Sequence, residues 1–199
     1  MQRILLLPVG AMAVAFFFIF PLIGIVSGTV VLDENFTGST PSNWTTYESP
    51  ALGLSFDYPS DWEVEEKQDR FDTAADVSVS DGSAKFFIVK IDNAKNKLIR
   101  SVGLADSVKA LEEAAGRDEN TNIIEETDLT KYKLGGERTG TFLYTKTEEL
   151  TDPYALQLFF VMHNGKTYSL GFRESTLTFD DPETQNILNK IIESFKFLG

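Results

Sequence analysis

The sequence predicts an α+β domain, an antiparallel β-sheet with helices packed on its faces, preceded by one N-terminal hydrophobic helix. Strands are indicated by short segments in which apolar and polar residues alternate between turn residues, as in residues 54–58 and 168–172. Helices are indicated where apolar residues recur every three or four positions, in residues 104–115 and 187–195. Hairpin signals between successive strands favour antiparallel pairing.

Composition limits both the size and the partners of the protein. The chain has 199 residues, of which 42% are hydrophobic and 24% charged, enough for one globular domain with a short appendage. The net charge of −12 argues against nucleic acid and against an anionic membrane surface as partners. The absence of cysteine excludes disulfides, thiolate metal sites, cysteine nucleophiles and an acylated cysteine anchor.

Residues 4–26 contain no charged residue and are long enough to cross a hydrocarbon core of about 30 Å. We therefore interpret residues 1–28 as a retained transmembrane anchor, with a cleaved signal peptide and a secreted product as the alternative. Arg3 precedes this segment, whereas Asp33 and Glu34 follow it. The positive-inside tendency then places the C-terminal domain outside the cytoplasm.

Residues 29–43 are rich in Gly, Ser, Thr, Pro and Asn, which is typical of a flexible linker. Asn35 and Asn43 each begin an Asn-X-Thr glycosylation sequon, as expected of an extracellular segment. The folded domain is predicted to occupy residues 44–199.

The first predicted strands are residues 45–48, 54–58 and 62–67. Pro59 ends the second of them because proline has no N–H to donate. Aromatic side chains in these and later elements could line a ligand pocket, but we expect them to form the core. They are Trp44, Phe56, Tyr58, Trp62, Phe172 and Phe195.

Turn and helix signals organise the remainder of the chain. Asp81-Gly82 predicts a two-residue hairpin turn, and Gly135-Gly136 and Asn164-Gly165 predict two more. Gly116 is expected to follow the first helix as its left-handed C′ residue. Asp181, before Pro182, is expected to cap the last helix. The remaining strands are predicted near residues 77–79, 86–89, 122–127, 137–144, 155–163 and 168–172.

Two stretches resemble the PsbP-like family. The first is Gly-Leu-Ser-Phe-Asp-Tyr-Pro-Ser-Asp-Trp at residues 53–62, and the second is the pair of segments 168–172 and 192–197. The resemblance extends over residues 44–199. It implies the Mog/PsbP fold, an α/β/α sandwich around an antiparallel sheet, used as an extracytoplasmic or lumenal accessory domain. The family's functional residues have no matching positions in this chain.

The sequence contains few candidates for chemistry, and we assign no catalytic or cofactor-binding residue. His163 is the single histidine and stands beside a hairpin turn, where a surface role is expected. Asp69, Asp72 and Asp76 could offer oxygen ligands to a hard cation such as calcium, although a solvated acidic loop is the simpler interpretation. A second acidic group, Asp180, Asp181 and Glu183, starts the last helix.

These observations favour a non-enzymatic, membrane-anchored extracytoplasmic domain that binds or stabilises a partner protein or envelope complex. There is no G-x-S-x-G, P-loop or dinucleotide-binding motif. The alternatives are an exported hydrolase that uses carboxylates as acid and base, and a protein that binds a small ligand or metal ion.

Overall fold

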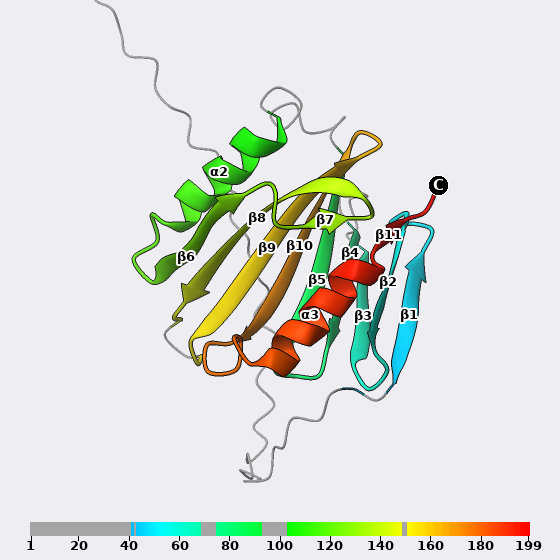
Figure 1. The fold of residues 1–199 in the computed structure, drawn as a ribbon, viewed down its shortest axis with the longest axis horizontal. Helices are drawn as coiled ribbons and strands as arrows, with labels where there is room; N and C mark the ends of the chain where they lie inside the picture. The colour runs from blue at the N-terminus through cyan, green and yellow to red at the C-terminus, as the bar shows by residue number, and fades with distance from the viewer. Residues whose placement is uncertain (1–40, 42, 69–74, 93–102, 149–150) are drawn as a thin grey trace, which may run out of the picture. The chain divides into compact units, whose positions relative to one another are not determined.

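The computed structural model describes residues 41, 43–68, 75–92, 103–148 and 151–199. Within these residues two helices and two antiparallel sheets form the domain (Figure 1), which confirms the α+β class. The predicted N-terminal helix lies outside the described residues, as does most of the linker. None of the helices that are described is long and apolar enough to cross a membrane.

The larger sheet has the strand order β3-β4-β5-β10-β9-β8-β6, with β7 paired to β8. All of its pairings are antiparallel. The strands are β3 (Glu63–Gln68), β4 (Ala75–Ser80), β5 (Lys85–Asp92), β6 (Thr121–Asp128), β7 (Lys133–Leu134), β8 (Glu137–Lys146), β9 (Tyr154–His163) and β10 (Lys166–Ser175). The long apolar strand β9 lies between β8 and β10.

A second, three-stranded sheet consists of β1 (Trp44–Ser49), β2 (Leu54–Pro59) and β11 (Lys196–Phe197), with β2 in the middle. The sequence predicted a single sheet, and this expectation was wrong. The two sheets separate after Pro59. A turn follows this residue, in which the Trp62 N–H donates a 3.1 Å hydrogen bond to the Pro59 carbonyl. The chain then enters β3 in the other sheet.

Helices cover opposite faces of the larger sheet, as expected for an α/β/α arrangement. Neighbouring residues of a strand point to opposite faces, so Phe159 and Phe160 of β9 belong to different clusters. Phe159 lies in the cluster that includes Leu188 of α3 (Pro182–Ser194). Phe160 lies with Val108 of α2 (Leu104–Ala115). Each fully buried aromatic or aliphatic side chain contributes about 1.5–3 kcal/mol.

Most of the predicted aromatic core is confirmed. Phe56, Phe172 and Phe195 are at most 2% exposed and Trp62 is buried, whereas Trp44 and Tyr58 are partly buried at the margin of the same cluster. Aromatic side chains of the two sheets meet here, as in the edge-to-face contact of Phe56 with Phe86 at a centroid distance of 5.3 Å. The core therefore joins the two sheets.

Two of the three predicted turns are confirmed. Gly135 and Gly136 have φ values of 56° and 84°, and Asn164 and Gly165 have φ values of 48° and 73°. These left-handed conformations are those that a two-residue hairpin turn requires. The prediction of a two-residue turn at Asp81 was wrong, because β4 and β5 are joined by a four-residue loop. One Asp81 carboxylate oxygen accepts hydrogen bonds from the N–H groups of residues 83 and 84, each at 2.8 Å.

The helix boundaries and the cap positions at Asp181 and Gly116 agree with the sequence, but the expected capping geometry is absent. α3 begins at Pro182 after Asp181, yet the Asp181 side chain makes no capping hydrogen bond. Its backbone carbonyl instead accepts the first helical hydrogen bond, from the Gln185 N–H at 3.0 Å. Gly116 follows α2 with a φ of −68°, so it is right-handed and not the predicted left-handed residue.

Candidate functional site

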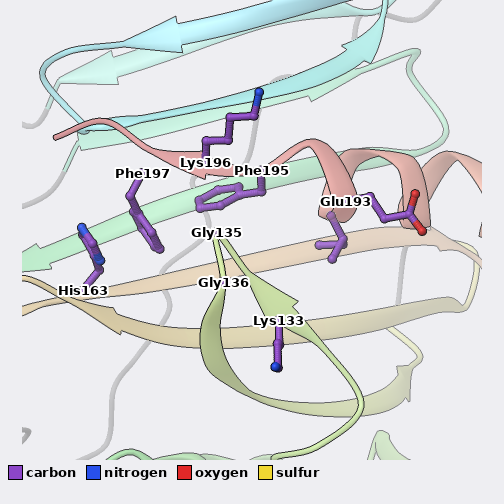
Figure 2. Close-up of a pocket in the computed structure, with 9 residues that line it drawn as sticks. Lys133, Gly135, Gly136, His163, Glu193, Phe195, Lys196 and Phe197 are labelled. Atoms are coloured by element: carbon purple, nitrogen blue, oxygen red, sulfur yellow. The ribbon is translucent and has the colours of Figure 1, made fainter.

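An open depression of about 410 Å³ lies where three parts of the domain meet. These are the β7–β8 turn, the β9–β10 turn at His163, and the segment in which α3 ends and β11 begins (Figure 2). The described residues that line it are Lys133, Gly135, Gly136, His163, Ile192, Glu193, Phe195, Lys196 and Phe197.

The aromatic floor of the depression depends on a close approach between Gly135 and Phe197. A Cβ atom at Gly135 would lie 2.6 Å from Cδ2 of the Phe197 ring, so a larger residue there would displace the ring. Phe197 is held by the pairing of β11 with β2, opposite Leu54. Its ring also makes an edge-to-face contact with Phe195, at a centroid distance of 5.2 Å. In Figure 2 both rings lie beside the glycine turn.

His163 lies against this floor and has a partner at each ring nitrogen. Its ring stacks on Phe197 with centroids 4.0 Å apart and an interplanar angle of 3°. The Asn164 side-chain amide donates to Nε2 at 3.0 Å, which makes Nε2 the acceptor. Nδ1 therefore carries the proton and donates it to the Glu137 carboxylate, also at 3.0 Å. The imidazole fixes the two neighbouring turns and the C-terminal segment together.

Tyr168 supports Phe197 from within the domain. Its ring centroid lies 5.1 Å from that of Phe197, and its hydroxyl donates a 2.9 Å hydrogen bond to the Leu52 carbonyl. Burial raises the pKa of the Tyr168 phenol. The phenol consequently remains protonated and serves as a structural donor.

The rim of the depression carries exposed charges. Lys133 and Lys196 are exposed, and neither forms an ion pair with another described residue. In Figure 2 their side chains extend to opposite sides of the aromatic floor. Glu193 is also exposed on this rim, whereas Glu137 is engaged by His163.

The arrangement presents an imidazole, an aromatic surface and exposed charges to a bound molecule. Both nitrogens of His163 are hydrogen bonded to neighbouring side chains, Nδ1 to Glu137 and Nε2 to Asn164. The described lining residues include no serine, threonine or cysteine that could act as a nucleophile. An aromatic floor between two exposed lysines instead offers apolar contact and positive charge.

None of the predicted site residues is among the described residues that line this depression. Asp69 and Asp72 lie outside the described residues, and Asp76 belongs to β4. Among the described residues no group of three or more His, Asp or Glu side chains could hold a metal ion. Of the two sequon residues, Asn35 lies outside the described part of the chain and Asn43 is exposed immediately before β1. Neither glycosylation nor cation binding is tested by these positions.

Sequence reasoning identified His163 but missed its partners Glu137 and Phe197. A signal did exist for one of them. Gly135-Gly136 and Asn164-Gly165 are turns at the ends of strands that are hydrogen-bonded neighbours, which brings Glu137 toward His163. Nothing local in the sequence places the C-terminal Phe197 between these turns.

The fold and the site define an α+β domain with a shallow binding surface and no evident catalytic set among its lining residues. A model of the PsbP-like protein family matches residues 32–197, and the chain therefore belongs to the PsbP-like family. A comparison with curated proteins gives no match.

Solved bacterial structures are similar to this domain. The cyanobacterial PsbP of Synechocystis is 14% identical with a TM-score of 0.52, and the match covers 81% of this chain and 95% of that one. LpqN, which is involved in cell envelope biogenesis of Mycobacterium tuberculosis, is 10% identical with a TM-score of 0.49 over 79% and 91% of the two chains. At these identities the likeness to cyanobacterial PsbP shows the fold alone.

Proposed function

We propose that this protein is a non-enzymatic accessory domain that binds or stabilises a partner protein outside the cytoplasm, tethered by the hydrophobic segment 4–26. Membership of the PsbP-like family supports the accessory role. The charge-free N-terminal segment, followed by Asp33 and Glu34, supports the tether and the orientation.

The observation that carries the proposal is the depression around Phe197. Its described lining has no serine, threonine or cysteine, both nitrogens of its histidine are hydrogen bonded to neighbouring side chains, and its rim presents two lysines without ion partners among the described residues. A concave aromatic surface with unpaired charges at its edge is typical of protein-interaction sites.

Purification of the full-length protein from native membranes in a mild, uncharged detergent tests the partner. We expect a second polypeptide to co-elute in constant ratio across size-exclusion fractions. Recovery of the protein alone at all concentrations would contradict the proposal. A protease added to intact cells tests the location: digestion of the C-terminal domain supports the proposed orientation, and protection that is lost on lysis contradicts it.

A further inference from the structure

The lysines and arginines of the described residues fall into two groups. Several are engaged: Lys109, Lys131 and Lys146 form ion pairs, and Arg173 and Lys190 lie over aromatic rings. Of the lysines and arginines whose side chains the structure describes, those without such a contact are Arg117, Lys133, Arg138, Lys166 and Lys196.

Four of these five unengaged cations belong to the depression or adjoin it. Lys133 and Lys196 line it. Arg138 is the pairing partner of Lys133 in the β7–β8 hairpin, and Lys166 is the pairing partner of His163. Arg117 is the one that lies elsewhere, in the turn after α2. In a protein with a net charge of −12, most of the unengaged positive charges whose side chains the structure describes thus lie around one concave site.

We propose that this depression binds a short acidic segment of a partner polypeptide that carries an apolar residue among its carboxylates; this inference rests on the proposed function. The apolar residue packs on the Phe197 ring, and the flanking carboxylates pair with Lys133 and Lys196 on opposite sides. The Glu193 carboxylate on the same rim partly offsets the positive charge of the two lysines. The Glu137 carboxylate is already paired with His163.

A short peptide fits this surface better than a longer polyanion. Nucleic acids and anionic membranes gain affinity from many simultaneous phosphate contacts, which an acidic protein surface repels. A depression of about 410 Å³ accommodates one or two side chains, and an acidic segment of a few residues remains within the local positive field. We therefore assign the site to a peptide and not to a lipid headgroup.

The probe is the peptide Asp-Glu-Phe-Asp-Glu with blocked ends and a neutral fluorophore, titrated with the full-length protein in uncharged detergent and followed by anisotropy. The neutral analogue Asn-Gln-Phe-Asn-Gln is the matched control. We expect saturable binding of the acidic peptide that weakens as salt rises from about 0.02 M to about 0.3 M. Equal binding of both peptides, or no binding of either, would overturn the inference.

Charge-reversed variants locate the binding. Lys196→Glu and Lys133→Glu should each weaken the acidic peptide about three- to ten-fold, because each removes one ion pair and adds a repulsion. Arg117→Glu changes the net charge equally at a distant exposed position and should change affinity less than about two-fold. Equal weakening by Arg117→Glu and Lys196→Glu would show a general charge effect and refute the site.

Two further outcomes separate this inference from the proposed function. If wild-type protein and Lys196→Glu co-purify with the same partner in the same ratio, the accessory function stands and the peptide site is refuted. If phosphatidylglycerol vesicles bind the protein and Lys196→Glu abolishes this binding while the peptide does not compete, the surface recognises lipid and the peptide assignment is wrong.

Discussion

Replacement of Gly135 by alanine tests whether the turn and the C-terminal segment are packed as the structure has them. The substitution imposes a left-handed conformation on an L-residue, which costs about 1–2 kcal/mol. It also places a Cβ atom 2.6 Å from the Phe197 ring and 3.4 Å from its backbone nitrogen, an overpacking that costs about 1–3 kcal/mol more. We expect a total loss of about 2–5 kcal/mol in the free energy of unfolding.

Gly136→Ala is the matched control, because Gly136 is also left-handed but a Cβ atom added there would meet no heavy atom within 4 Å. Its cost should be the backbone strain alone, about 1–2 kcal/mol. Urea denaturation of the full-length protein, followed by the fluorescence of Trp44 and Trp62, measures both. Phe197→Ala should remove most of the difference between the two variants. Equal losses for Gly135→Ala and Gly136→Ala would refute the packing of Phe197 on this turn.

Three other outcomes follow from the structure. Glu112→Ala should lower the free energy of unfolding by about 2 kcal/mol in urea titrations, because the buried carboxylate accepts the Thr127 N–H at 2.7 Å and would leave it unpaired. Burial acts to raise the pKa of Glu112, but hydrogen bonds from Lys109 and Thr127 outweigh it and lower the pKa. The ionised carboxylate should therefore stabilise the fold fully above about pH 4.3, and this contribution should disappear as the pH falls through the lower pKa of the folded state. In thermal melts between about pH 6 and 3, the melting temperature should consequently fall more steeply for wild type than for Glu112→Gln. If the domain passes through a glycosylating compartment, Thr45→Ala should remove a glycan from the exposed Asn43, seen as a loss of mass, and an unchanged mass would contradict glycosylation there.

Local chemistry explains why the turns and strands were predictable. Asn164-Gly165 and Gly135-Gly136 accept positive φ at little cost, so their position in the chain fixes hairpins without reference to the rest of the fold. The alternation of large and small residues in 54–58 likewise predicted a half-buried strand. The Asp81-Gly82 pair led to a wrong prediction, because the Asp81 side chain accepts hydrogen bonds from two backbone N–H groups and so stabilises a longer loop.

The second sheet and the candidate site could not be predicted in this way because they depend on distant pairing. β2 pairs with β11 through Leu54 and Phe197, which lie near opposite ends of the domain sequence. The stacking of His163 on Phe197 requires this pairing and two separate hairpins. The sequence therefore predicted a lone surface histidine, whereas its role depends on which segments the sheets bring together.

Site-specific photocrosslinking in native membranes tests whether the depression contacts a partner protein. A photoreactive residue replaces Glu193, which is exposed on the rim of the depression and is not one of its lysines. The control carries the same residue at Asn120, exposed in the turn between α2 and β6. We expect a crosslink to one additional polypeptide from position 193 that is absent from position 120 and is reduced by Lys196→Glu. Equal crosslinking from the two positions, or none from position 193, would contradict the proposed interaction.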